Sequence, residues 1–147
     1  MGLKDRISAD MKDAMRQKDS ARLETVRLLR AAIQRREVDE RIELDDRGVL
    51  EVVQKMVKQS NDAASQFDQG GRDDLAEKER ASIAFLEQYL PEQLSPEEID
   101  EIVTRAISET GASSIKDMGK VMALVKSQVQ GKADMGAVSA IVKSKLA

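Results

Sequence analysis

Tyr89-Leu90-Pro91-Glu92-Gln93-Leu94-Ser95-Pro96 contains the only two prolines of the 147-residue chain, and helical patterning flanks it on both sides. Proline removes a backbone donor and disfavours the helical conformation of the residue before it, so a helix that reaches Leu90 cannot continue into the next one. The stretch therefore predicts two helical domains, at residues 1–90 and 97–147, joined by a proline hinge at 91–96.

The N-terminal part of the sequence predicts four helices. Apolar residues recur at intervals of three and four, and aspartates such as Asp45 stand where N-caps are expected. Gly70 and Gly71 mark the end of the third helix. The segments cover about residues 3–15, 20–41, 46–69 and 73–90. Four helices with short connections favour an antiparallel four-helix bundle, and the fold class is all-α.

The C-terminal part predicts a three-helix tail domain. Ser95, Pro96 and Glu98 form the sequence pattern of a capping box with proline at the first helical position. Gly111 ends this helix, and two further helices follow at about 114–130 and 135–146. A domain of this size has a core just large enough to fold alone.

Composition narrows the possible chemistry. The chain has no histidine, cysteine or tryptophan, so it lacks the usual neutral general base, the thiolate nucleophile and the ligands of structural zinc. We expect no metal and no cofactor. The longest apolar run, Val121–Val125, is too short for a membrane helix, and the first residues lack the apolar core of a secretory signal. These features predict a cytoplasmic protein without a membrane partner.

The tail has an uneven charge distribution. Residues 91–115 carry six acidic residues against one arginine, whereas residues 116–147 carry six lysines against two aspartates. Candidate contacts to nucleic-acid phosphates are Lys116, Lys120, Lys132 and Lys143. Lysines on a surface helix are, however, commonly only solubilising.

A second basic face is possible on the second helix, where Arg27, Arg30 and Arg41 point away from the core. Acidic residues on the same segment can neutralise much of its field. These acids are Glu24, Glu37, Asp39 and Glu40.

Four stretches together resemble the YqeY family of bacterial proteins over the full chain. They are Thr25–Ile33, Tyr89–Ser95, Lys116–Met122 and Gly131–Asp134. The family is similar to the helical and tail regions of GatB, a component of the glutamyl-tRNA(Gln)/aspartyl-tRNA(Asn) amidotransferase. That resemblance implies a four-helix bundle followed by a three-helix tail, and contact with tRNA through the tail.

The resemblance leaves three functions open. The first is a non-catalytic tRNA-associated module that contacts RNA phosphates through the four tail lysines, and the second is a protein-interaction module that docks on a tRNA-handling enzyme. The third is carbon-nitrogen ligase activity with glutamine as amido-N-donor, as the family label implies. The chain shows no phosphate-binding glycine loop and no cysteine nucleophile, so no catalytic residues are assigned.

Overall fold

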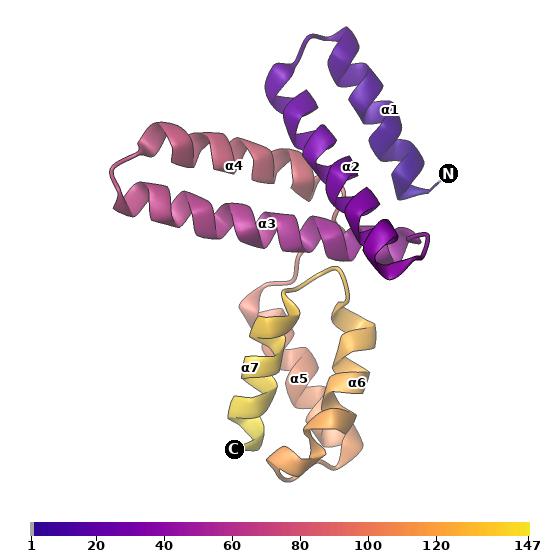
Figure 1. Ribbon diagram of the computed structural model, residues 1–147. Coiled ribbons are helices and arrows are strands. Elements are labelled where there is room, and N and C mark those ends of the chain that lie inside the picture. The colour runs from indigo at the N-terminus through magenta and orange to yellow at the C-terminus, as the bar shows by residue number, and fades with distance from the viewer. Residues whose placement is uncertain (1) are drawn as a thin grey trace. The chain divides into compact units, whose positions relative to one another are not determined.

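The computed structural model describes residues 2–147, and their regular structure is entirely helical, which confirms the all-α fold class (Figure 1). The α-helices are α1 (Leu3–Arg16), α2 (Ser20–Glu40), α3 (Asp46–Gln69), α4 (Asp73–Glu87), α5 (Pro96–Thr110), α6 (Met118–Val129) and α7 (Met135–Leu146). A 3-10 turn, η1 (Ile115–Asp117), precedes α6.

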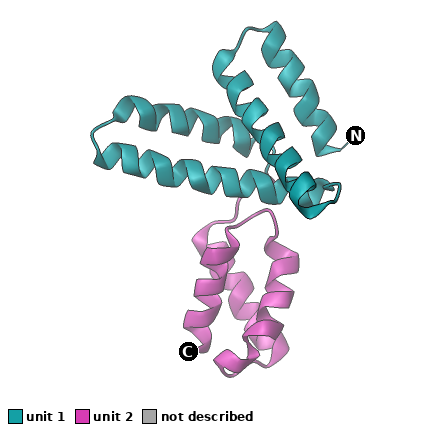
Figure 2. Cartoon of the chain, in the orientation of Figure 1, with its two compact units in different colours: residues 1–90 teal, residues 91–147 magenta. Residues whose placement is uncertain are grey.

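The chain divides into two compact units, residues 1–90 and 91–147 (Figure 2). Helix α4 ends at Glu87, and the last residues of the first unit form a turn in which the amide of Tyr89 donates to the carbonyl of Leu86 at 3.1 Å. Pro91 follows directly, where a helical hydrogen bond could not be made.

The N-terminal unit consists of two antiparallel helical hairpins, α1–α2 and α3–α4, with α2 crossing the second hairpin (Figure 1). The four helices therefore do not lie side by side as in the expected four-helix bundle. The segment between α2 and α3 begins with Arg41 in a left-handed conformation (φ 55°), and it leads the chain from the first hairpin to the second.

The core of this unit lies where the hairpins cross. Its buried members come from all four helices, the loop before α3 and the turn after α4: Ile7, Val26, Leu29, Ile33, Leu44, Val49, Val52, Val53, Leu86 and Tyr89. The other half of the α3–α4 hairpin lies outside this cluster and closes on small side chains, with Ala64 and Ala76 both buried. Small residues at these positions allow close packing of the two helices. This part of the hairpin extends beyond α2 (Figure 1).

Side-chain caps fix several helix starts, as the sequence predicts. Asp19 accepts from the amide of Arg22 at 3.2 Å, and Asp45 accepts from that of Gly48 at 2.9 Å. At the start of α5, Ser95 and Glu98 accept from each other's amides at 3.1 and 3.2 Å, which is a complete capping box.

The C-terminal unit packs α5, α6 and α7 around buried valines and other apolar residues. The segment expected to act as a hinge is bound to this unit. The amide of Leu94 donates to the carbonyl of Lys132 at 2.9 Å, and the Gln93 side chain donates to the carbonyl of Gly131 at 2.9 Å. Residues 93–94 therefore hold the start of α5 against the α6–α7 loop.

Candidate functional site

The four lysines predicted to contact nucleic acid lie on four elements of the C-terminal unit. Lys116 is in η1, Lys120 is in the first turn of α6, Lys132 is in the α6–α7 loop and Lys143 is in the last turn of α7. All four side chains are exposed.

The valine spacing of α6 determines where its lysines point. Val121, Val125 and Val129 are fully buried, and they occupy one face of the helix. At 100° per residue, Lys120 points away from that face. Lys116, one turn earlier, points to the same side as Lys120. Packing of the valines therefore presents this pair of ammonium groups to solvent.

Three of the four lysines, Lys116, Lys120 and Lys143, lie toward the same end of the C-terminal unit. Helices α6 and α7 run in opposite directions, so the last turn of α7, with Lys143, lies toward the end of the unit where α6 begins (Figure 1). Lys132 follows the other end of α6, which its 12 residues place about 18 Å away along the helix axis. It does not belong to the same cluster.

These lysines have no carboxylate partner among residues 2–147. Within that range, the only ion pair formed by a lysine of the C-terminal unit joins Lys145 to Asp100 of α5 at 2.9 Å. The two aspartates of the lysine-rich segment instead bind backbone amides: Asp117 accepts from Ser113 at 3.1 Å, and Asp134 accepts from Gly136 at 3.1 Å. Lys116 and Lys120 therefore form no ion pair with Asp117.

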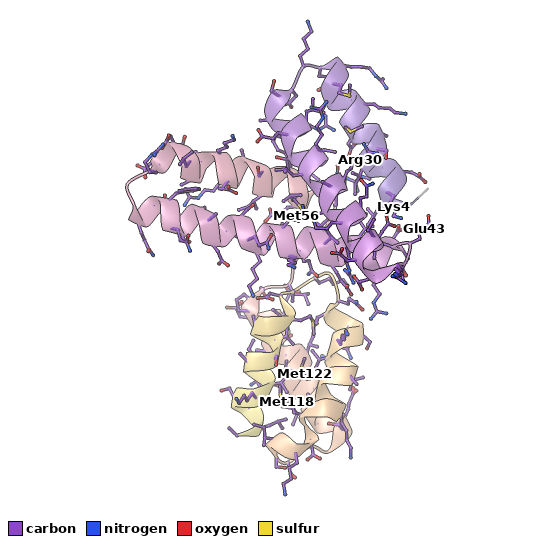
Figure 3. The ribbon with its side chains drawn as sticks, in the orientation of Figure 1. Lys4, Arg30, Glu43, Met56, Met118 and Met122 are labelled. Atoms are coloured by element: carbon purple, nitrogen blue, oxygen red, sulfur yellow. The ribbon has the colours of Figure 1, made fainter. Side chains whose placement is uncertain are left out.

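Lys126, which is not among the four predicted lysines, is also exposed and has no ion pair in the described chain. It lies one turn after Met122 and two turns after Met118, the half-buried methionines that pack against the core of this unit (Figure 3). Because these three positions are four residues apart, they lie on the same side of α6, and this spacing in the sequence could have placed Lys126 beside the two methionines.

Basic residues of the N-terminal unit are often paired, in contrast to the lysines of the tail. A hydrogen bond to the Asp13 carboxylate raises the pKa of Arg22, whose guanidinium also lies 3.6 Å from Asp10. Hydrogen bonds to the carboxylates of Glu40 and Glu51, at 2.5 and 2.8 Å, raise the pKa of Arg36. These two arginines of α2 therefore have structural partners.

The other arginines of α2, and Arg41 directly after it, have no carboxylate partner of this kind in the described chain. Arg27, Arg30, Arg35 and Arg41 are exposed and form no ion pair within residues 2–147. The acids expected to neutralise this face are largely engaged with other groups.

Among residues 2–147, no group of three or more His, Cys, Asp or Glu side chains is placed to hold a metal ion. None of the helices in this part of the chain has the length and apolar content needed to cross a bilayer.

Comparison with known proteins identifies relatives over nearly the whole chain. The model of the family described as "Yqey-like protein" matches residues 4–146. The chain is 34% identical over 132 residues to "Altered inheritance of mitochondria protein 41, mitochondrial" of Pyrenophora tritici-repentis, covering 87% of this chain and 71% of that protein. The protein of the same name from Kluyveromyces lactis is 34% identical over 107 residues, and that from Candida glabrata 33% over 88 residues. These alignments cover 70% and 58% of this chain, and 57% and 48% of the two relatives.

These relatives correct two expectations from the sequence. The chain was expected to be bacterial and cytoplasmic, whereas the relatives are eukaryotic proteins that are named as mitochondrial. The cytoplasmic assignment depended on the lack of an apolar signal segment. That criterion detects secretory signals only, because mitochondrial targeting sequences are amphipathic and basic instead of continuously apolar.

Proposed function

This chain belongs to the YqeY-like family, and from that membership and the unpaired lysines of its C-terminal unit we propose that it is a non-catalytic module that binds folded RNA. Lys116, Lys120 and Lys143 contact phosphate groups in this proposal, and Lys126 extends the surface along α6. The observation that supports it most is that these exposed lysines have no carboxylate partner in the described chain.

Phosphate contact by lysine is independent of base sequence, so the surface positions an RNA without reading it. The surface lacks aromatic side chains on which unpaired bases could stack, since the only aromatic residues of the chain are Phe67, Phe85 and Tyr89 in the N-terminal unit. A folded RNA such as a tRNA, recognised by its backbone, suits this chemistry.

The small residues of α7 also favour close approach of a polynucleotide backbone. Gly136 and Ala140 are exposed one turn apart on α7, and Lys143 follows within the next turn. A Cβ built on Gly136 would meet only the side chain of Asp134, at 3.5 Å or more, so solvent lies over this strip.

The test measures the affinity of the full chain for a tRNA transcript by fluorescence anisotropy at 50 and 200 mM salt. Three phosphate contacts predict a log-log slope of about −2.7, which is a roughly 40-fold loss of affinity between these concentrations. The variant Lys116→Glu/Lys120→Glu/Lys143→Glu should lose this binding at both salt concentrations.

A matched control reverses three exposed charges of the N-terminal unit, in the variant Lys12→Glu/Arg16→Glu/Lys55→Glu. Like Lys143, Arg16 lies in the last turn of its helix, so the control reproduces that interaction with the helix dipole. Equal binding by the tail variant and the wild type, or equal loss in both variants, would remove the proposal. The single variant Lys132→Glu should keep most of the affinity because Lys132 lies outside the cluster.

A further inference from the structure

Helix α2 separates two grooves on the surface of the N-terminal unit. The groove between α1 and α2 has a volume of about 530 Å³, and its polar lining includes Lys4, Ser8, Arg27, Arg30 and Gln34. The groove between α2 and the α3–α4 hairpin also measures about 530 Å³ and is mainly apolar. In Figure 3, Lys4 and Arg30 lie along the first groove, and Met56 of the second groove lies beside the crossing of α2 and α3.

The apolar groove contains both phenylalanines of the chain. Phe67 of α3 and Phe85 of α4 are half-buried, and Leu28 at the edge of the groove is 56% exposed. The groove has residues of α2 on one side and residues of α3 and α4 on the other. Exposed apolar surface of this kind, with charged residues around it, is typical of binding sites for proteins.

The exposed side of α2 carries an excess of positive charge that cannot be seen in the sequence. Three of the four acids on this segment are paired with other cations: Glu24 lies 3.7 Å from Lys78, Glu37 binds Lys4, and Glu40 binds Arg36 at 2.5 Å. Among these four acids, only Asp39 has no cationic partner within the described chain. Four exposed arginines of the same segment have no carboxylate partner there: Arg27, Arg30, Arg35 and Arg41.

The pairing of Glu37 also has an electrostatic effect on the polar groove. The hydrogen bond from Lys4 lowers the pKa of Glu37 most, and the hydrogen bond from the amide of Leu44 lowers it further. This carboxylate therefore stays charged and bound to its partners. Arg30 has only the sulfur of Met11 as a side-chain partner in the described chain, at 2.9 Å. The guanidinium groups of Arg27 and Arg30 therefore remain available to an external anion.

We propose that α2 and its two flanking grooves form a docking surface for an acidic amphipathic helix of a partner protein. Apolar side chains of that helix occupy the groove lined by Leu28, Phe67 and Phe85, and its carboxylates bind Arg27 and Arg30. The planar guanidinium binds a carboxylate with two parallel hydrogen bonds, which gives the pairing direction as well as affinity.

The apolar groove favours a protein over a nucleic acid as the occupant, because contact with half-buried phenylalanine side chains does not stabilise charged phosphate groups. A second copy of the chain is also a poor match. Its acidic helix, α5, already buries its apolar face through Ile99, Val103 and Ala106 within its own unit. The proposal concerns the N-terminal unit only, so it does not depend on RNA binding by the tail lysines.

The probe for this surface is a synthetic fluorescein-labelled peptide of about 18 residues, roughly 27 Å long as a helix. It carries leucines at positions i, i+4, i+7 and i+11, with glutamates on both flanks of that stripe. A matched peptide has lysine in place of every glutamate. Anisotropy titrations with the full chain should show that the acidic peptide binds at least tenfold more tightly than the basic one.

Two variants of the protein locate the binding. Arg27→Glu/Arg30→Glu should weaken the acidic peptide at least tenfold, and Leu28→Ala should weaken it roughly threefold by removing an exposed apolar side chain. The control Arg47→Glu/Arg105→Glu has the same change of charge at exposed arginines that do not line the grooves, and it should bind as the wild type does. Circular dichroism and thermal melting check that each variant is folded.

Several results would overturn the proposal. Failure of the acidic peptide to bind, or binding that is unchanged in both α2 variants, would exclude this surface. A dimer in sedimentation experiments that Leu28→Ala dissociates would assign the groove to a second copy. Loss of tRNA binding in Arg27→Glu/Arg30→Glu, with no peptide binding by the wild type, would assign the arginines to nucleic acid.

Discussion

Replacing Tyr89 with phenylalanine removes one hydroxyl group from the point where α1, α2 and the end of the N-terminal unit meet. Tyr89 is 6% exposed, and its hydroxyl donates to the Asp10 carboxylate at 2.6 Å. The other carboxylate oxygen of Asp10 lies 3.6 Å from the guanidinium of Arg22, and the guanidinium of Arg6 lies 4.9 Å from the centre of the Tyr89 ring. The hydroxyl is thus one member of a charged network that joins segments distant in the sequence.

The expected loss of stability follows from the type of hydrogen bond. A bond to a charged acceptor contributes about 1.5–3 kcal/mol. Arg22 remains beside Asp10, and 23% of the Asp10 side chain is open to water, so we expect about 1.5 kcal/mol, at the low end. For a unit of 90 residues this lowers the Tm by about 6–12 °C. The ring stays in place, so its packing and its contact with Arg6 are kept.

Alkaline pH provides an independent check of the same contact. Burial, and then the hydrogen bond to Asp10, raise the pKa of Tyr89 above its ordinary value. The native state therefore keeps the phenolic proton when the unfolded chain loses it, near pH 10. The stabilisation is complete below about pH 10 and falls above it, by up to about 1.4 kcal/mol per pH unit. Phenylalanine has no such proton, so the stability difference between wild type and variant should shrink as the pH rises above 10.

The assay is urea unfolding followed by circular dichroism at pH 7, 9 and 11, for the wild type, Tyr89→Phe, Asp10→Asn and the double variant. The double-mutant cycle should give a coupling between Tyr89 and Asp10 of about 1 kcal/mol or more at pH 7. A coupling near zero, or a difference between wild type and Tyr89→Phe that stays constant up to pH 11, would refute the assigned hydrogen bond.

Two further predictions concern the C-terminal unit. Ser95→Ala removes the capping box with Glu98 and should cost about 1 kcal/mol in urea unfolding; an unchanged midpoint would contradict the cap. Gly111→Ala should destabilise by about 1 kcal/mol because the residue adopts a left-handed conformation (φ 68°), whereas Gly119→Ala, in α6 with nothing within 4 Å of the added methyl group, should stabilise by about 0.5–1 kcal/mol. Equal Tm shifts for the two glycine variants would show that backbone conformation does not control these positions.

Local features of the fold could be predicted from the sequence because their causes are local. The caps at Asp45 and Ser95, and the helix end at Gly111, depend on hydrogen bonds and backbone angles within a few residues. The crossing of the two hairpins depends on which buried faces meet in space, and the expected four-helix bundle is not confirmed. Ala64 and Ala76 illustrate this, because helical periodicity marks them as apolar without revealing that they close a hairpin beyond the main core.

The candidate sites differ in the same way. Exposure of Lys116 and Lys120 follows from the valine spacing of α6, which the sequence contains. The position of Lys143 at the same end of the unit as Lys116 and Lys120 requires the antiparallel packing of α6 and α7, which only the fold shows. The free arginines of α2 were discounted because Glu24 and Glu37 are near them in the sequence. Glu24 is paired with Lys78 and Glu37 with Lys4, and both lysines come from other helices. Only the fold shows that these two glutamates already have cationic partners.

Both proposed surfaces have one physical origin, which is that nearby carboxylates are already bound to other groups. Asp117 binds a backbone amide beside the tail lysines, and Glu24 and Glu37 bind lysines from other helices beside the arginines of α2. A sum of charges misses this, since the chain has a formal net charge of −3. A net negative protein repels a polyanion at long range and attracts it only within about a Debye length of its unpaired cations, roughly 8 Å at physiological salt. The two surfaces should therefore act through short-range contacts and give little electrostatic acceleration of association.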